Sequence, residues 1–527
     1  MASPRKVLLI TADQWRGDAL GLVQSNAPLT PNLDRLAAEG VAFRRHFANA
    51  APCGPARASL LTGLYPFIHR SVRNGTPLDH RFTNIALEAR KAGFHPVLFG
   101  YTDTALDPRA GPTGDPRYET FEGVMPGFDL VAVHNESALQ PWLAELARKG
   151  YQIKRPDMSV YRHPGSTERM KRFSRGPALY KAEDSDTAYI TDKVLDYLHF
   201  RRKEPWFIHA VYLRPHPPLI APEPYNALVD AAAVAAPRRL RALDDERKIH
   251  PFLDAWLKEQ DGVSYFKSQV NMQHLSDEEI RDARAVYLGL IVEVDAQVGR
   301  ILDHLRKSGE IDDTLVVFSS DHGEMLGDHW CWGKGGWFDP SYHLPLIIRD
   351  PLAPAGARGT ERHELTEAVD IAPTILDWLR QAPPESFCGR SLIPWLHGKT
   401  PQTWRRHVVF EFDFRSFGNP GIETALGLSP DQSTLSVIRS NRFKYVHFTT
   451  LPPLLFDLES DPDELRDLSR DPTYKDVLSA GARRLLSHRM LHADRTLTNT
   501  RLGAGGPKTW TGPRGELADD MFVGTTA

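Results

Sequence analysis

Hydrophobic residues along the chain gather in short apolar runs, and longer segments with helical spacing lie between them. The runs at residues 7–11, 96–100, 206–213 and 314–320 are typical of strands buried in a parallel sheet. Residues 344–348 predict one more strand. Because these strands alternate with helical segments, the pattern predicts an α/β/α sandwich with a mostly parallel central sheet.

Two of the predicted helices have clear signals at their ends. Thr30 and Pro31 begin one that closes at Gly40. A capping box of Ser276 and Glu279 begins a longer one, whose apolar positions recur until about residue 309. A third is expected at residues 366–378, although it contains a proline.

The pattern changes at about residue 400. Four short strands are predicted there without long helices between them, at residues 407–414, 435–439, 443–448 and 454–458. We therefore expect an α/β catalytic domain at residues 1–399 and, at 400–527, a smaller α+β subdomain with an antiparallel sheet and an extended tail. Residues 104–190 and 219–275 are irregular and are interpreted as insertions, the first of which shapes the mouth of a site.

Composition narrows the class of protein. With 527 residues, 41% of them hydrophobic and 25% charged, the chain has the make-up of a globular protein with one large and one smaller domain. A net charge of −3 provides no basic field for nucleic acid. The three cysteines form no disulfide or zinc pattern, and no signal peptide or membrane span is evident. We therefore expect a cytoplasmic protein with no membrane partner.

The segment from Cys53 to Arg57 is the first candidate for chemistry. Pro55 favours a first helical turn and Gly63 ends the helix, so Cys53 is expected just before a helix N-terminus, where N–H groups bind anions. Arg57 adds donors suited to phosphate or sulfate oxygens. Two other interpretations are a buried structural cysteine and a thiolate phosphatase; the latter requires five residues between Cys and Arg, and here there are three.

Two predicted strands end in an acid followed by a polar residue. Asp13 and Gln14 follow the first, and Asp321 and His322 follow the strand at 314–320. If these strands are neighbours, the four side chains converge beside Cys53 as a metal site. Oxygen ligands with one imidazole suit Mn²⁺ or Zn²⁺ better than an all-oxygen Ca²⁺ cage. Each pair alone is also compatible with a helix cap or a turn.

The run Cys-x-Pro-x-Arg, followed by Leu61-Thr62-Gly63-Leu64-Tyr65, resembles the sulfatase signature of the alkaline phosphatase superfamily. Within it, the chain most resembles phosphonate monoester hydrolases and related phosphodiesterases, over nearly its whole length. The resemblance implies an alkaline phosphatase-like fold and oxidation of Cys53 to formylglycine by a formylglycine-generating enzyme. It also implies one divalent metal ion, with Mn²⁺ favoured and Zn²⁺ or Ca²⁺ as alternatives, and a homotetramer.

The resemblance also assigns roles to individual residues. The implied metal ligands are Asp13, Gln14, Cys53, Asp321 and His322, the implied catalytic residues are Cys53, Arg57, His216 and Lys334, and the implied substrate-binding residues are Asn74, Tyr101 and Asp103. Hydrated formylglycine would attack phosphorus or sulfur, and its second hydroxyl would release the product. His216 is expected to protonate the leaving oxygen while Lys334 holds a charged one.

Two departures guide the choice of substrate. Similar sulfatases carry Gly-Lys-Trp-His where this chain has Gly100-Tyr101-Thr102-Asp103, and Asp-Asn where it has Asp321-His322. Both favour the phosphonate hydrolases. That group has a hydroxyl residue at the position of Asp103, and a carboxylate there would repel a dianion and tolerate a monoanionic ester.

The sequence therefore predicts a metal-dependent hydrolase of small phosphonate monoesters and phosphodiesters that is promiscuous toward sulfate esters. A dedicated arylsulfatase is the alternative enzyme. A catalytically inactive binding scaffold is the alternative of another class.

Overall fold

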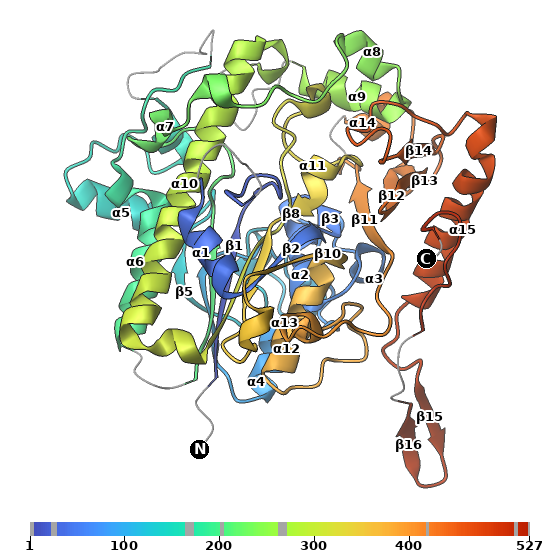
Figure 1. The fold of residues 1–527 in the computed structure, drawn as a ribbon. Helices are drawn as coiled ribbons and strands as arrows, with labels where there is room; N and C mark the ends of the chain where they lie inside the picture. Colours follow the sequence, from blue (N-terminus) through green and yellow to red (C-terminus); the bar gives the residue numbers. More distant parts are fainter. Residues whose placement is uncertain are drawn as a thin grey trace.

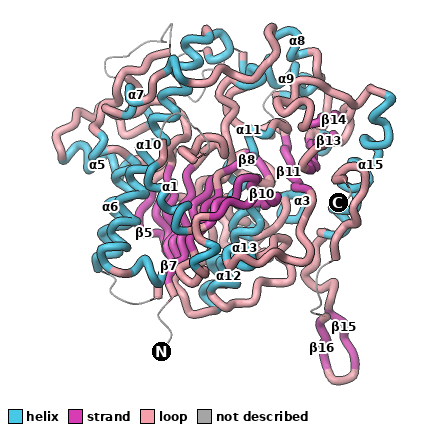
Figure 2. The backbone as a smooth tube through the Cα atoms, viewed as in Figure 1, coloured by secondary structure: helices cyan, strands magenta, loops and turns pink. Residues whose placement is uncertain are grey.

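A nine-stranded sheet lies at the centre of the molecule, between two layers of helices (Figures 1 and 2). The computed structural model describes residues 5–22, 29–163, 173–200, 205–261, 271–417, 421–510 and 515–524, so parts of both predicted insertions, 164–172 and 262–270, lie outside the described residues. The strand order is β10 (Thr360–Glu367), β2 (Val41–Phe47), β9 (Leu346–Arg349), β7 (Thr314–Ser320), β1 (Lys6–Ala12), β6 (Phe207–Tyr212), β4 (Pro96–Gly100) and β5 (Asp129–Val133), with β8 (His343–Leu344) paired to β2.

The sheet is mostly parallel, as predicted. β1 lies between β6 and β7 and runs parallel to both, and every residue of β1 and β7 is buried. The strand predicted at 344–348 is instead divided into β8 and β9, both antiparallel to β2, with Pro345 between them. Proline has no N–H to donate to a neighbouring strand, which accounts for the break.

Three strands of this sheet have no simple apolar run in the sequence. β2 carries two arginines at its centre, and β10 is almost entirely polar, with Leu365 as its one apolar residue. β5 lies within the irregular region 104–190 and pairs in parallel with β4 at the edge of the sheet. This region therefore contributes a strand to the central sheet as well as surface loops.

Helices cover both faces of the sheet. On one face α1 and α6 both contact α10, and on the other α2, α4 and α12 contact one another (Figure 1). The helices are α1 (Pro31–Glu39), α2 (Cys53–Thr62), α3 (Pro66–His69), α4 (Ile85–Lys91), α5 (Gln140–Arg148), α6 (Asp186–Phe200), α7 (Tyr225–Leu228), α8 (Leu243–Arg247), α9 (Pro251–Gln260), α10 (Asp277–Ser308), α11 (Asp339–Tyr342), α12 (Ile371–Trp378), α13 (Ile393–Leu396), α14 (Ile422–Ala425) and α15 (Lys475–Leu491).

The predicted helix ends are confirmed for the longest helix and shifted for another. α10 has the capping box of Ser276 and Glu279 and closes at Gly309, whose φ of 75° suits glycine. α12 begins at Ile371, later than predicted, because residues 366–367 complete β10. Among the described residues, no helix combines the length and apolarity needed to cross a bilayer.

A second sheet of five strands is built from the C-terminal part of the chain. Its order is β14 (Leu454–Asp457), β13 (Phe443–Phe448), β12 (Thr434–Ser440), β11 (His407–Asp413) and β3 (Ala50–Ala51). The four C-terminal strands are antiparallel neighbours, as predicted, but β3 comes from the N-terminal part and pairs in parallel with β11. Because β3 is followed almost directly by α2, this sheet supports the start of the helix that carries Cys53.

The tail, predicted to be extended, contains a hairpin. β15 (Thr500–Gly503) pairs with β16 (Gly506–Thr509) through a two-residue turn of Ala504 and Gly505, and the φ angles of Gly505 and Gly506 are 97° and 99°. Figure 1 shows this hairpin projecting from the rest of the molecule.

Candidate active site

The carboxyl ends of β1 and β7 bring the first pair of acids together. Ala12 lies opposite Ser320 in the parallel register, so Asp13 and Asp321 leave the sheet side by side. The Ser320 hydroxyl donates to Ala12 O over 2.7 Å, and the backbone N–H of Gln14 donates to Asp321 Oδ1 over 3.1 Å. These bonds fix the spacing of the two strand ends, and with it the spacing of the two carboxylates.

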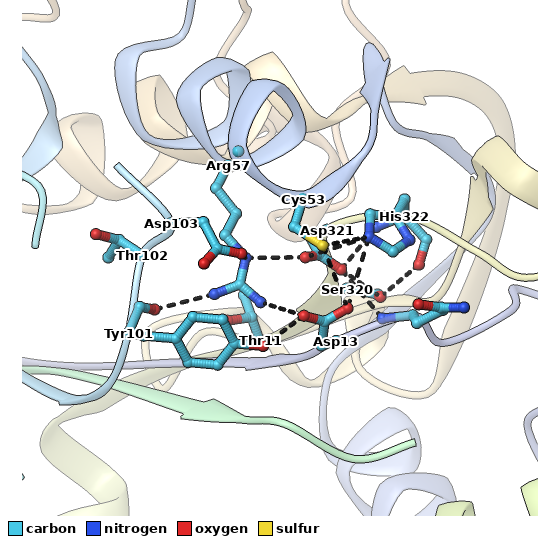
Figure 3. Close-up of polar contacts among 12 residues, drawn as sticks. Thr11, Asp13, Cys53, Arg57, Tyr101, Thr102, Asp103, Ser320, Asp321 and His322 are labelled. Carbon is cyan, nitrogen blue, oxygen red and sulfur yellow. Dashed lines mark hydrogen bonds and ion pairs between the residues drawn. The ribbon is translucent and has the colours of Figure 1, made fainter. Parts of the chain in front are cut away.

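Helix α2 brings Cys53 to the same place. Cys53 is the first residue of the helix, one position further in than expected, and all ten residues of the helix are buried. Its Sγ lies 3.2 Å from His322 Nε2 and 3.9 Å from Asp13 Oδ1. Figure 3 shows Cys53 and Arg57 reaching from the helix toward the carboxylates.

Four of the five predicted metal ligands form one cluster. Ligand atoms of Asp13, Cys53, Asp321 and His322 lie within 4.8 Å of one another, and all four residues are buried. His322 Nε2 is 3.5 Å from Asp13 Oδ1 and 3.7 Å from Asp321 Oδ2.

The state of His322 suits metal binding. Its Nδ1 lies 3.0 Å from Gly323 O and donates there, which leaves the lone pair of Nε2 directed at the cluster. Burial lowers the pKa of His322, so the ring is neutral. Two carboxylates and one neutral imidazole are donors that fit a divalent ion.

Arg57 compensates the two carboxylates. Its Nε donates to Asp321 Oδ2 and its Nη2 to Asp13 Oδ2, both over 2.8 Å, while Nη1 donates to Tyr101 O over 3.0 Å. The guanidinium carbon lies 4.0 Å from the centre of the Tyr101 ring. All three nitrogens of Arg57 thus have protein acceptors, and the residue holds Asp13 and Asp321 in place.

Tyr101, predicted to bind substrate, lies behind the cluster. Its hydroxyl donates to the same Asp13 oxygen that Arg57 contacts, and burial raises the pKa of this phenol well above its usual value. The phenol is therefore a neutral donor. In this structure it orients Asp13 Oδ2, while Asp13 Oδ1 faces Cys53 and His322.

Gln14 links the cluster to Lys334. Gln14 has a φ of 68°, in the left-handed region that residues other than glycine seldom adopt, and such conformations gather at functional sites. Its Oε1 accepts from Lys334 Nζ over 2.6 Å, and its Nε2 donates to the Glu324 carboxylate. Glu324 also accepts from the N–H of Gly333 over 2.6 Å, which positions the segment that carries Lys334.

Glu324 was missed as a site residue by the sequence analysis. The available signal was its position two residues after His322 in the run Asp321-His322-Gly323-Glu324.

Lys334 carries a positive charge. Burial lowers the pKa of its amine, but the acidic groups around it outweigh that effect and raise the pKa above its usual value.

His216 lies in a rigid turn after β6. Its Nδ1 donates to Pro217 O over 2.7 Å. The fully buried Arg214 holds the turn, because its Nη1 donates to His216 O and Pro218 O over 2.8 and 3.0 Å. Burial, aided by Lys334, lowers the pKa of His216 well below its usual value, so the ring is neutral here. Arg214 pairs in turn with the buried Asp186 over 3.2 Å, and neither residue was predicted from the sequence.

Asn74 contacts the backbone at the start of α2. Its Oδ1 accepts the N–H of Gly54 over 2.8 Å and so satisfies one of the unpaired donors at the helix N-terminus. Glycine at position 54 eases this close approach, because a Cβ there would lie 3.1 Å from that oxygen, a tight contact. Asn74 therefore holds the helix start beside Cys53.

Asp103 has an unexpected charge state. Its backbone has a φ of 47°, and its Oδ2 lies 3.9 Å from Arg57 Nε. Burial, together with the charges of Asp13 and Glu122, raises the pKa of Asp103 to about 8 despite Arg57. At neutral pH the carboxyl is mostly protonated, so the repulsion of dianions expected from the sequence is weakened.

The chain is similar to known proteins of the sulfatase family along most of its length. The sulfatase family matches residues 5–382, and the family described as N-sulphoglucosamine sulphohydrolase, C-terminal, matches residues 327–490. The multifunctional alkaline phosphatase superfamily protein PehA of Trinickia caryophylli is 40% identical over 523 residues, covering 96% of this chain and 99% of that protein.

Two further matches bear on the chemistry. An arylsulfatase of Clostridium perfringens is 28% identical, covering 89% of this chain and 91% of that protein. The crystal structure of the phosphonate monoester hydrolase of Agrobacterium radiobacter superposes with a TM-score of 0.90 at 42% identity, covering 96% of this chain and 100% of that one.

Proposed function

The chain belongs to the sulfatase family, and we propose that it is an ester hydrolase that cleaves phosphonate monoesters and phosphodiesters at the site around Cys53. The observation that carries the proposal is the convergence of Cys53 with Asp13, Asp321 and His322, with the cation of Lys334 linked to them through Gln14. The similarity to a phosphonate monoester hydrolase at 42% identity supports this choice of ester.

The proposed cofactors are one divalent ion and formylglycine at position 53. The ion would be held by Asp13, Asp321 and His322, together with Gln14 and residue 53. One imidazole among oxygen donors favours Mn²⁺, with Zn²⁺ and Ca²⁺ as alternatives. When present, the ion supplies a Lewis acid, and the hydrated aldehyde made from Cys53 supplies the oxygen nucleophile. A formylglycine-generating enzyme is the partner that this maturation requires.

The chain's own residues prepare the site for an anionic ester. Arg57 and Tyr101 fix Asp13 and Asp321, so the two carboxylates do not have to move when substrate binds. Asn74 holds the N-terminus of α2, whose N–H groups favour negative charge. Asp103 lies beside Arg57 and is protonated at neutral pH, which permits an anion nearby.

Lys334 and His216 act on the leaving group. Hydrolysis breaks the bond between phosphorus and the ester oxygen; water supplies the oxygen that the acid keeps, and the alcohol leaves with a proton. Lys334 carries the positive charge that stabilises the leaving oxygen. His216 is neutral with Nδ1 donating to Pro217, so it delivers a proton from Nε2 only after the approach of an anion has favoured its cationic form.

A dedicated arylsulfatase is the second candidate, because the Clostridium perfringens arylsulfatase matches most of the chain. The two are separated by measuring kcat/KM for an aryl phosphonate, an aryl phosphodiester and an aryl sulfate that release the same phenol. The proposed function predicts that both phosphorus esters exceed the sulfate. A sulfate that exceeds both by tenfold or more would identify a sulfatase instead.

We also propose a homo-oligomer in which the hairpin β15–β16 packs on another copy. Within the described residues its two strands pair with each other and with no other strand, and an isolated two-stranded hairpin is only marginally stable in water. Leu497, Leu502 and Trp510, in and beside the hairpin, are exposed by 73%, 77% and 55%. The molar mass in solution, compared between the full chain and a variant that lacks residues 500–509, tests this.

A further inference from the structure

A cavity of about 470 Å³ opens beside the site, and apart from Gly333 and Lys334 its lining residues take no part in the contacts described above. Pro52, the neighbour of Cys53, lines it at one place, and Gly333 and Lys334 line it at another. It is therefore continuous with the position where the ester oxygen would meet Lys334.

The walls of the cavity are mainly apolar and aromatic. They are formed by Trp256, Met272, Trp332, Phe412 and Ile422, each no more than 6% exposed. Gln260, also on the wall, uses both ends of its amide on the backbone of Trp332, at 3.0 and 3.1 Å. Arg73 and Glu259 also line the cavity, and burial lowers the pKa of Arg73.

The segment after Lys334 builds the aromatic wall. Gly335 and Gly336 have φ angles of 133° and 63°. A Cβ at 335 would lie 2.7 Å from Phe412 Cζ, and a Cβ at 336 would lie 2.8 Å from Trp256 Cζ3. The two rings thus rest directly on the backbone next to Lys334, and the charged amine and the aromatic wall are placed by one turn of the chain.

We propose that this cavity holds the leaving alcohol of the substrate and that it selects esters whose alcohol is aromatic or comparably bulky and apolar. The inference rests on the proposed ester hydrolysis and adds to it the class of leaving group. A ring in this cavity exchanges water for the faces of Trp256 and Phe412, while its oxygen remains beside Lys334. A small alkyl alcohol would leave these walls wet and gain none of that contact.

The experiment compares three phosphonate esters whose alcohols have matched acidity, so that chemical reactivity is constant: 2-naphthyl, phenyl and a small fluorinated alkyl. The wild type should show kcat/KM values that fall in that order by about tenfold overall. Trp256→Leu should abolish most of this preference and lower kcat/KM for the naphthyl ester by about tenfold, with little change for the fluoroalkyl ester.

Phe414→Leu is the matched control. Phe414 is a buried ring of the same aromatic cluster, 4.9 Å from the ring of Phe252, but it does not line the cavity. The Phe414→Leu variant should keep the wild-type preference for the naphthyl ester. If both variants lose that preference equally, the loss reflects general loosening of the aromatic cluster, and the proposal is overturned.

Binding of 2-naphthol, followed by tryptophan fluorescence, tests the cavity without turnover. The wild type and Phe414→Leu should bind it, and Trp256→Leu should bind about tenfold more weakly. Equal affinity in all three proteins would overturn the inference even if every ester is hydrolysed. Naphthol binding that depends on Trp256 would support the proposed role of the cavity even if no ester is hydrolysed. The absence of hydrolysis would contradict only the proposed function.

Discussion

His322 Nε2 lies 3.2 Å from Cys53 Sγ, although 269 positions separate the two residues in the chain. One comes from the end of a central strand and the other from the first turn of α2, so the contact depends on the whole sandwich. Asp13 and Asp321 surround the same point, and Arg57 compensates their charge from behind. The following predictions test the parts of this arrangement separately.

Asp13→Asn should lower divalent metal content. The change removes one anionic donor but keeps the shape of the side chain, so the affinity for Mn²⁺ should fall by at least about tenfold. Metal analysis after dialysis against graded Mn²⁺ measures it. Asp18→Asn makes the same change at a residue that pairs with Arg16 outside the cluster, and it should retain wild-type metal content. Equal content in both variants would contradict the assigned ligand.

Arg57→Ala should destabilise the metal-free protein more than the metal-loaded protein. Removal of the buried guanidinium leaves two carboxylates uncompensated, at a cost of about 3–5 kcal/mol in the free energy of unfolding. A bound divalent ion would replace part of the lost charge. Denaturant unfolding with chelator and with Mn²⁺ measures the difference, and a loss that is the same in both would show that Arg57 does not serve the metal ligands.

Asp103 should control the discrimination against dianions in a pH-dependent way. Because the pKa of this carboxyl is about 8, it gains charge as the pH rises past that value and then repels a phosphate monoester dianion. The ratio of monoester to diester turnover should therefore fall by a few-fold between pH 7 and 9 in the wild type. Asp103→Thr should raise the ratio at pH 9 and keep it flat. An unchanged ratio in the variant would exclude this role.

Glu293 should make the protein less stable as the pH rises. Burial and the nearby Asp186 raise the pKa of Glu293 to about 8 in spite of Arg214, whereas the unfolded chain loses this proton near its ordinary value of 4.5. Unfolding between these values releases a proton, so rising pH favours the unfolded state. The free energy of unfolding should fall by about 3 kcal/mol between pH 5.5 and 8 through this group. Glu293→Gln should remove that part of the slope, and a slope identical to wild type would refute the assignment.

The sequence predicts those strands and helices whose local residue pattern is sufficient to determine their structure. The strands at 96–100 and 314–320 have apolar centres at 97–99 and 315–318, and α10 has both a capping box and a closing glycine. β2 and β10 are different, because their charged residues become acceptable only through the neighbouring strands and loops. Single-chain patterns do not contain that information.

In the candidate site, too, some residues could be predicted from local sequence patterns and others could not. Asp13, Cys53, Asp321 and His322 could be identified because each follows a strand or opens a helix, and the structure brings their ligand atoms within 4.8 Å. The places of Tyr101 and Asn74 could not, because a residue beside a site faces either the substrate or the supporting groups according to packing alone. Glu324, Arg214 and Asp186 support the site through contacts that no spacing in the sequence reveals.

The most direct test of the account is the mass of the tryptic peptide that spans residues 46–57. The protein should be produced together with a formylglycine-generating enzyme and loaded with Mn²⁺. We expect a peptide in which the thiol of Cys53 has been replaced by an aldehyde, in a fraction that rises in step with the hydrolysis of an aryl phosphonate. Full activity from protein in which Cys53 remains an unmodified thiol would contradict the proposed nucleophile.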